Sequence, residues 1–413
     1  MRVALVVPGG VSRDGEHRVI PAVLWLIERL ARRHDVHVVV PRQEPRPGAW
    51  RLRGATVHNL GAAPGRGRAL AVRTLLRLHR ERPFDVFHAL WARGPGEVAV
   101  VAAKLCRRPA LVHVAGGELV WLADVPFGTR RRLTRALARW VVRRADRVTA
   151  ASTTMLELVE RAGGRPIRLP LGVDTTVWRV APPRPREAGR AARIVHVGSL
   201  TPVKDHALLL RALATLTRAG RDVRVDLVGE DTSGGAVQRI AHELGVADRV
   251  AFHGFLPQRR AVPVVHAADL MAVTSRHEAG PVAMLEAAAV GVPTVGTAVG
   301  HVRDWAPDAA VAVPIGDADA LAAAIAGLLD DDARRLAIAR RAQELALRED
   351  ADWTCARFEE LYAEVVGAAD AAASTVADAG AAVLAADAAA AVATAANRDA
   401  AATTDAGPRE HIN

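Results

Sequence analysis

The chain has 413 residues, of which 50% are hydrophobic and 4% aromatic, and it carries a formal net charge of +10 at pH 7. This length predicts two domains with aliphatic cores, and no charge-free apolar stretch reaches the roughly 20 residues that a membrane-spanning helix needs. Cys106 and Cys355 match neither a metal-site spacing nor a disulfide framework, which indicates a reducing compartment. The apolar run at 3–7 is too short for the core of a signal peptide, so we expect a cytoplasmic protein.

Basic side chains are concentrated in the first half of the chain. Residues 1–190 contain 35 Lys and Arg against 15 Asp and Glu, whereas residues 191–413 contain 20 against 30. Such an asymmetry indicates two functional halves. The basic half has either plain solvated helix faces or a surface that meets an anionic acceptor or the inner face of a membrane, and the sequence leaves both alternatives open. No nucleic-acid partner is expected.

Strands and helices alternate through the first half. The expected strands lie at 3–7, 36–40, 56–60, 84–89, 110–114, 147–151 and 167–169, and the expected helices at 19–33, 70–82, 98–106, 129–147 and 152–162. The segment 41–68 is rich in Pro, Gly and Arg, which favours an irregular excursion. A glycine-rich loop that ends at Gly15 follows the first strand. Without a complete G-x-G-x-x-G, it is either an ordinary tight turn or a phosphate contact.

The same alternation returns in the second half. The expected strands lie at 193–197, 223–228, 250–253, 269–274, 293–297 and 310–314, and the expected helices at 206–219, 236–244, 281–291, 318–329, 331–348 and 352–366. This pattern predicts an α/β fold with two doubly wound parallel-sheet (Rossmann-like) domains facing across a cleft.

The domain boundaries follow from composition. We place an N-terminal domain at 1–182, a Pro-rich linker at 183–190 and a second domain at 191–350. A terminal helix at 351–367 is expected to cross back to the N-terminal domain. The Ala-, Asp- and Thr-rich tail at 368–413 is expected to be disordered, with a docking tail as the alternative.

Two carboxylates flank the start of the helix expected at 281–291. Glu278 lies in the preceding loop and Glu286 within the helix, at a strand end of the kind where open α/β sheets bind ligands. Both suit neutral hydroxyl groups and not phosphate, because two anions repel. Lys204, one of only two lysines, lies in a loop before a helix. Its ammonium either neutralises a diphosphate or is simply solvated.

No metal site is predicted, because no His, Cys, Asp or Glu cluster has convincing ligand spacing. Asp317-Ala318-Asp319 spells D-x-D, but it stands directly before an Ala-rich helix, so we interpret Asp317 as a helix N-cap. His88, His113 and His277 lie near strand ends, where each is either a structural or a catalytic residue.

In their order along the chain, these motifs resemble the retaining glycosyltransferases of the GT-B fold, family 4 (group 1). Glu278 and Glu286 match the E-x7-E signature of that family, and the match continues through 286–295. The other matching segments lie at 84–88, 169–174, 197–200 with Lys204, 228–230, 252–257 and 267–270.

The resemblance implies transfer of a sugar from a nucleotide-diphosphate donor to a lipid, glycan or small-metabolite acceptor, with retained anomeric configuration and without a metal or cofactor. It implies catalytic roles for Glu278, Lys204 and His113, with Lys204 on the diphosphate, Glu278 on the donor sugar and Glu286 on the ribose. The implied acceptor-side positions are His88, Gly116, Gly117 and Glu118. The implied donor-binding positions are Gly15, Gly198, Ser199, Lys204, Gly229, Glu278, Ala279, Gly280, Pro281, Val282 and Glu286.

Four positions depart from the family pattern. Ser199 stands where a second cationic Arg is usual, and Ala115 stands where a His is frequent, with His113 two residues earlier on the same strand face. Gly280 replaces a common Phe, and His301 replaces a usual Gly. These departures keep two other hypotheses open: a catalytically reduced sugar-nucleotide-binding partner, and a nucleotide-sugar epimerase on the same fold.

Overall fold

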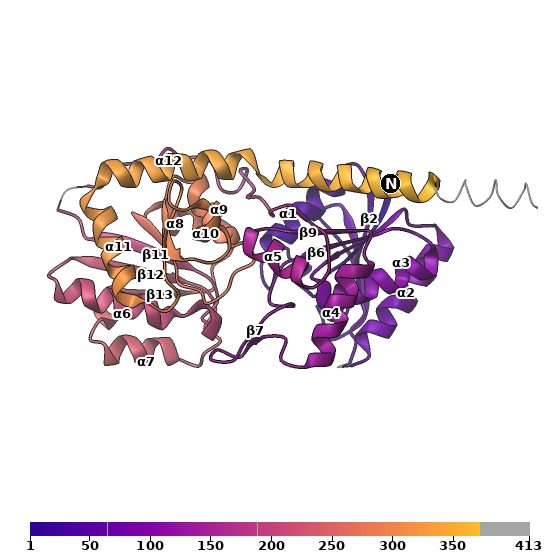
Figure 1. Ribbon diagram of the computed structural model, residues 1–413, viewed down its shortest axis with the longest axis horizontal. Coiled ribbons are helices and arrows are strands. Elements are labelled where there is room, and N and C mark those ends of the chain that lie inside the picture. Colours follow the sequence, from indigo (N-terminus) through magenta and orange to yellow (C-terminus); the bar gives the residue numbers. More distant parts are fainter. Residues whose placement is uncertain (64, 188, 372–413) are drawn as a thin grey trace, which may run out of the picture. The chain divides into compact units, whose positions relative to one another are not determined.

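The computed structural model describes residues 1–63, 65–187 and 189–371. One compact unit spans Met1–Tyr362, and a second unit begins at Ala363. The first unit contains two α/β halves, coloured indigo to magenta and pink to orange in Figure 1, each built on its own sheet. The prediction of two doubly wound parallel-sheet domains is therefore confirmed.

An eight-stranded sheet in the order β10-β9-β6-β5-β1-β2-β4-β3 forms the centre of the first half, and its neighbouring strands are parallel except β3 and β4. Its strands are β1 (Arg2–Val6), β2 (Asp35–Val40), β3 (Gly48–Leu52), β4 (Ala55–Asn59), β5 (Val86–Leu90), β6 (Ala110–Val114), β9 (Arg147–Ala150) and β10 (Pro166–Arg168). Its helices are α1 (Pro21–Leu30), α2 (Gly67–Glu81), α3 (Glu97–Cys106), α4 (Arg132–Arg144) and α5 (Thr153–Arg161). A small antiparallel pair, β7 (Trp121–Leu122) and β8 (Phe127–Gly128), follows β6.

A six-stranded sheet in the order β13-β12-β11-β14-β15-β16 forms the centre of the second half. Its strands are β11 (Ala192–Val197), β12 (Val223–Val228), β13 (Val250–Gly254), β14 (Leu270–Val273), β15 (Thr294–Thr297) and β16 (Val311–Val313). Its helices are α6 (His206–Arg218), α7 (Ala236–Glu243), α8 (Gln258–His266), α9 (Val282–Ala289), α10 (Gly300–Trp305), α11 (Ala318–Asp330) and α12 (Asp332–Arg348).

Strand burial explains the central position of each sheet. Every residue of β1, β5, β6 and β14 is buried, as expected of parallel strands that helices cover on both faces. The order of the strands reverses between β5 and β1 in the first sheet and between β11 and β14 in the second. Ligands of such folds bind at the carboxyl ends of strands at these switch points.

Five elements were not expected from the sequence: β3, β7, β8, α8 and α10. β3 pairs only with β4 at the sheet edge, where a single row of hydrogen bonds tolerates Gly- and Arg-rich sequence. α8 contains Pro263, a residue that normally indicates a helix end. Among the described residues, no helix combines the length and hydrophobicity that crossing a membrane requires.

Residues 351–371 are helical. Within the first unit this helix contacts the N-terminal half: Arg33 Nη1 lies 2.9 Å from Glu359 Oε2, and the Tyr362 hydroxyl lies 2.6 Å from His88 Nδ1. Of the segment expected to be disordered, residues 368–371 are helical, and residues 372–413 lie outside the described residues.

Arg29 connects three segments of the first unit. Its Nε donates to Asp352 Oδ1 at 2.8 Å and its Nη1 donates to Asp174 Oδ2 at 3.3 Å. The Arg29 and Asp174 side chains are only 3% and 5% exposed. Burial alone would raise the pKa of Asp174, but hydrogen bonds from Arg29 and Thr176 outweigh it and lower that pKa.

We therefore expect Arg29→Met to lower the free energy of unfolding by about 3 kcal/mol, because it leaves the Asp174 carboxylate buried without its cation. Arg33→Met is the matched control. Its side chain is 74% exposed, so its loss should cost less than about 1 kcal/mol. Urea denaturation measures both variants, and equal losses would contradict a special role for Arg29.

Candidate functional site

Two loops at the switch point of the second sheet meet beside each other. β11 and β14 are parallel neighbours, so the loops that follow them leave the same edge of the sheet. Thr274 Oγ1 donates to the Lys204 carbonyl at 2.8 Å, and the Arg276 N–H donates to the Val203 carbonyl at 2.8 Å. These bonds hold Lys204 against the loop that carries Glu278.

Lys204 and Glu278 form an ion pair. Lys204 Nζ lies 2.5 Å from Glu278 Oε1, and the Ser275 hydroxyl donates to the same oxygen at 2.6 Å. The side chains of Lys204 and Glu278 are 26% and 13% exposed, so a ligand can reach both. The structure thus joins the cation predicted for the diphosphate to the carboxylate predicted for the sugar.

Two glycines shape the loop that holds Lys204. A Cβ at Gly229 would lie 2.0 Å from the Gly198 carbonyl oxygen, and a Cβ at Gly198 would lie 3.2 Å from Lys204 Cε. Only glycine permits so close a crossing of the loops after β11 and β12. Ser199 follows Gly198 in an exposed position.

The segment between Glu278 and α9 packs against the first half. Ala279 is buried within the hydrophobic core of that half. α9 begins at Val282, after Pro281, and no side chain caps its N-terminus. Its first N–H groups can therefore face an anionic ligand.

The side chains at positions 280 and 301 are complementary in size. A Cβ at Gly280 would lie 2.7 Å from Ala151 Cβ and 2.8 Å from His301 Nε2. The His301 ring therefore occupies the space that a side chain at position 280 would need. Two departures from the family pattern, Gly280 for Phe and His301 for Gly, thus compensate each other.

Glu286 is a buried carboxyl group with few partners. It is 6% exposed, and burial raises its pKa to about 8, although contacts with Gln258 and Trp178 act in the opposite direction. Gln258 Nε2 lies at the long distance of 3.5 Å from Glu286 Oε1. Glu286 is therefore mostly protonated at pH 7 and retains hydrogen-bonding capacity for a ligand.

Gly15 lies near this carboxyl group. A cavity of about 250 Å³ is lined by Gly15 and Glu16 from the first half and by Gln258 and Arg259 from α8. Because Gln258 also contacts Glu286, the glycine loop lies in the same region as Glu286, the residue predicted to bind the ribose.

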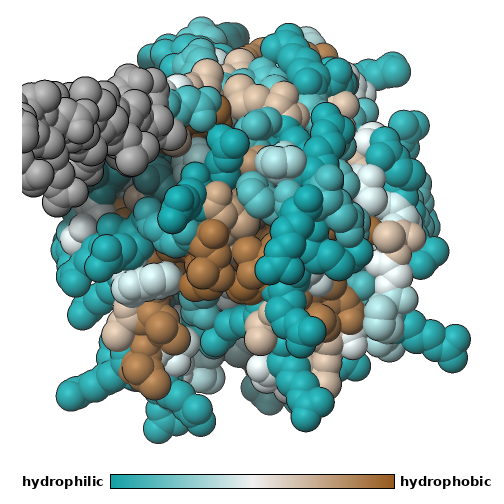
Figure 2. Space-filling model, turned by 90° about the vertical axis from the view of Figure 1, so that its right-hand side faces the viewer, coloured by the Kyte–Doolittle hydropathy of each residue, from teal (hydrophilic) through white to brown (hydrophobic). Residues whose placement is uncertain are grey.

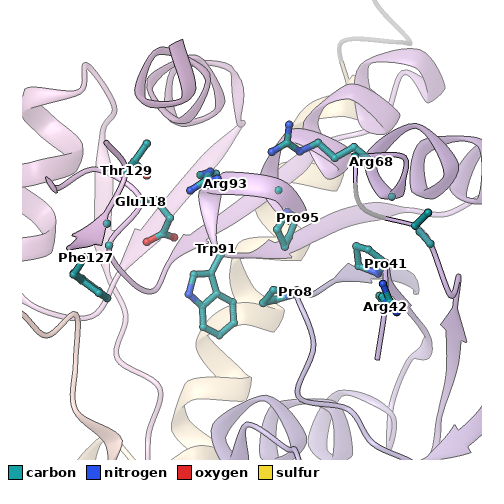
Figure 3. Close-up of a pocket in the computed structure, with 17 residues that line it drawn as sticks. Pro8, Pro41, Arg42, Arg68, Trp91, Arg93, Pro95, Glu118, Phe127 and Thr129 are labelled. Carbon is teal, nitrogen blue, oxygen red and sulfur yellow. The ribbon is translucent and has the colours of Figure 1, made fainter. Parts of the chain in front are cut away.

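A larger cavity, of about 630 Å³, lies at the carboxyl edge of the first sheet (Figure 3). Gly117 and Glu118, two of the positions predicted for the acceptor side, line it together with Trp91 and Phe127. Gly116 lies beside it, because a Cβ there would lie 3.0 Å from Trp91 Nε1 and 3.3 Å from Glu118 Oε2.

His88 and His113 lie in the core of the first half. His88 is fully buried with Nδ1 2.6 Å from the Tyr362 hydroxyl, and His113 is 1% exposed with Nδ1 2.9 Å from Thr149 Oγ1. Burial lowers the pKa of His113 to about 4 and the pKa of His88 well below its usual value. Both rings pack against Phe358, and neither contact involves the Lys204–Glu278 pair.

Trp91, Phe127 and Arg276 were missed in the sequence. Phe127 lines the larger cavity and packs on His277 with ring centroids 5.7 Å apart, which links that cavity to the residue before Glu278. Arg276 pairs with Asp124 and, at 3.5 Å, with Asp205. Only the proximity of Arg276 to the E-x7-E motif could have indicated it.

The described residues contain no group of three or more His, Cys, Asp or Glu side chains arranged to hold a metal ion. Asp317 caps α11 by accepting a hydrogen bond from the Ala320 N–H at 2.9 Å. Its interpretation as an N-cap is confirmed.

Two protein families match the chain, one on each half. The family described as "Glycosyl transferase 4-like domain" matches residues 19–172. The family described as "Glycosyl transferases group 1" matches residues 181–345.

Individual proteins agree with these matches. The 2-deoxystreptamine glucosyltransferase of Streptomyces kanamyceticus is 30% identical over 302 residues, which cover 67% of this chain and 76% of that protein. The D-inositol 3-phosphate glycosyltransferase of Nocardia farcinica is 35% identical over 190 residues, and this match spans only 41% of each protein. Anabaena Alr3699/HepE, solved in complex with UDP-glucose, has a TM-score of 0.67 at 20% identity, with 88% of this chain and 99% of that chain covered. With both halves matched in order and the fold shared, the chain belongs to the group 1 family of glycosyltransferases with the GT-B fold.

Proposed function

We propose that the protein transfers a glycosyl group from a nucleotide-diphosphate sugar to a hydroxyl group of an acceptor, with retained anomeric configuration and without a metal ion. The Lys204–Glu278 ion pair beside the uncapped start of α9 carries this proposal. HepE binds UDP-glucose in its solved structure, which supports uridine nucleotides as the first donors to test.

The ion pair is the donor-free form of the site. A diphosphate carries more negative charge than a carboxylate, so it displaces Glu278 from the Lys204 ammonium. Glu278 then accepts hydrogen bonds from hydroxyl groups of the donor sugar. Lys204 and the N–H groups at the start of α9 stabilise the charge that develops on the diphosphate as it leaves.

Retention places the acceptor hydroxyl on the same face of the sugar as the departing diphosphate. The departing oxygen gains negative charge and is the nearest base. It takes the hydroxyl proton while the new glycosidic bond forms and the sugar–phosphate bond breaks. No side-chain base is needed for this step, which agrees with the burial of His113.

Lysine and glutamate variants should change nucleotide affinity in opposite directions. Lys204→Met removes the cation of the diphosphate and should weaken UDP binding by about 10- to 100-fold, whereas Lys104→Met, at the other lysine, should leave it unchanged. Glu278→Gln removes the competitor of the diphosphate, so UDP should bind at least as tightly while donor turnover falls by about 100-fold. Calorimetry with UDP, and nucleotide release from UDP-, GDP- and TDP-sugars in EDTA, measure the two effects. Weaker UDP binding in both Lys204→Met and Glu278→Gln would contradict the proposed competition between Glu278 and the diphosphate for Lys204.

Glu286 should release a proton when it binds the ribose. Two ribose hydroxyls that donate to the carboxylate favour its ionised form and lower its pKa from about 8 in the free protein. The affinity for UDP should therefore rise as the pH rises towards 8 and stay constant above that value. Calorimetry at pH 7 in buffers of different ionisation enthalpy should detect close to one released proton, and Glu286→Gln should abolish this release. Equal binding enthalpies in all buffers for the unmodified protein would refute the assignment.

We also propose that the enzyme works at an anionic membrane surface. Figure 2 shows hydrophobic side chains gathered on one face of the molecule and surrounded by hydrophilic ones. We give the name α4 surface to the exposed large apolar residues of α2, α3 and α4: Leu70, Val101, Leu105, Leu133 and Trp140. Arg131, Arg132 and Arg139 lie exposed around them. Apolar groups combined with arginines favour anionic lipid headgroups.

Vesicle sedimentation tests this surface. Binding to phosphatidylglycerol vesicles should exceed binding to phosphatidylcholine vesicles and should weaken in high salt. Replacement of both Leu133 and Trp140 by Asn should reduce binding by about ten-fold or more. The control replaces Phe255 and Ile315, exposed apolar residues of the second half, and should bind as before. Equal binding to both lipids would contradict the proposal.

A further inference from the structure

At the large cavity of the first half, the described residues satisfy only one oxygen of a buried carboxyl group. Glu118 is 5% exposed. Its Oε1 accepts hydrogen bonds from the N–H groups of Ala92 at 3.1 Å and Ala115 at 3.3 Å. Its Oε2 has no hydrogen-bond partner among the described residues. A buried carboxyl oxygen without a partner is costly, so a donor group of a ligand should satisfy it.

The same cavity has two free cations on its wall. Arg42, Arg68 and Arg93 line it. Figure 3 shows Arg93 beside Trp91 and Glu118, and it shows Arg68 and Arg42 farther along the cavity, with Arg42 beside Pro41. Arg68 is paired with Glu97 at 2.8 Å. Arg42 and Arg93 are exposed and form no ion pair within the part of the chain that the structure describes. Guanidinium groups bind phosphate oxygens with two parallel hydrogen bonds.

Trp91 is held in an unfavourable backbone conformation at this cavity. Its φ is 75° and its ψ is 125°, a combination that is rare for a bulky side chain. The Trp91 N–H donates to the His113 carbonyl at 2.8 Å, and the Gly96 N–H donates to the Trp91 carbonyl at 2.9 Å. Such strain gathers at ligand sites, and here it fixes an aromatic ring beside the free oxygen of Glu118.

We infer that this cavity binds an acceptor that is a phosphorylated polyol. A hydroxyl of the acceptor donates to Glu118 Oε2, and its phosphate lies on Arg42 and Arg93. Glu118 is a positioning residue for the acceptor, and the reacting hydroxyl points towards His277 and Glu278 across Phe127. This inference rests on the proposed function and adds the chemical class of the acceptor. An amine-bearing acceptor would suit Glu118 but would be repelled by two unpaired arginines.

Glucose 6-phosphate, glucose and glucosamine form a matched set of probes. Calorimetry should show glucose 6-phosphate binding about ten-fold or more tightly than glucose, with glucosamine weaker still. Replacing Arg42 and Arg93 together by Ala should remove this preference and leave UDP binding unchanged. The control replaces Arg334 and Arg340, exposed residues of α12, by Ala. It removes the same two positive charges and should leave the preference for glucose 6-phosphate unchanged.

Glu118→Gln should weaken the binding of both glucose 6-phosphate and glucose, because it changes the hydroxyl contact and leaves the arginines in place. Thermal unfolding of each variant shows that it is folded. A phosphatidylinositol phosphate in neutral vesicles tests a lipid source of the same chemistry. Binding to these vesicles that depends on Arg42 and Arg93 would assign the phosphate to a lipid headgroup, whereas binding of the soluble probe alone would assign it to a soluble acceptor.

Equal affinity for glucose and glucose 6-phosphate, with UDP binding intact, would overturn the inference and leave the proposed donor site standing. Failure of the unmodified protein to bind UDP, with arginine-dependent binding of glucose 6-phosphate retained, would contradict the proposed function and sustain the phosphate site.

Discussion

The ion pair between Lys204 and Glu278 is the interaction on which the proposed donor site depends, because we propose that a diphosphate competes with the carboxylate for the ammonium. Lys204 and Glu278 come from loops after neighbouring parallel strands, and Lys204 Nζ lies 2.5 Å from Glu278 Oε1. Without a partner, the Lys204 side chain would sample many conformations. The ion pair instead holds its ammonium at the position where we propose that the diphosphate binds. The loops can bring these groups together only because Gly229 passes the Gly198 carbonyl oxygen at a distance that no Cβ allows. In the proposed mechanism, donor binding then releases the Glu278 carboxylate, which accepts hydrogen bonds from the sugar.

The sequence placed the residues predicted for the donor side on recognisable elements more easily than those predicted for the acceptor side, for a physical reason. Gly198, Lys204, Gly229 and Glu278 lie in the loops that follow hydrophobic strands, and Glu286 lies in α9. Periodicity indicated these elements, and the family resemblance indicated which residues in them to choose. His88 and His113 also lie near strand ends, but their strands are completely buried, and the register turns both rings into the core. Trp91 comes from an irregular segment and Phe127 from the two-residue strand β8, and both are too short to show periodicity. The sequence did not indicate β3 because its segment is rich in Gly, Arg and Pro. It did not indicate α8 because that helix contains a Pro.

The departures from the family pattern have different structural outcomes. Gly280 and His301 belong to one exchange of volume, since the ring of one fills the space that the other leaves. Ser199 remains uncharged, and Arg276, the nearby cation, is already neutralised by Asp124 and Asp205. In the proposed site, Lys204 and the start of α9 would therefore have to balance more of the diphosphate charge than they would beside a second free cation. Arg42 and Arg93, the arginines of the proposed acceptor cavity, lie in the first half and not in the half that carries Lys204.

A structure with UDP bound tests the central claim most directly. We predict that the diphosphate lies on Lys204 Nζ and the first N–H groups of α9, and that the Glu278 carboxylate has moved away from the ammonium towards the position of the donor sugar. A complex in which UDP is bound and Lys204 Nζ remains on Glu278 Oε1 would contradict the account.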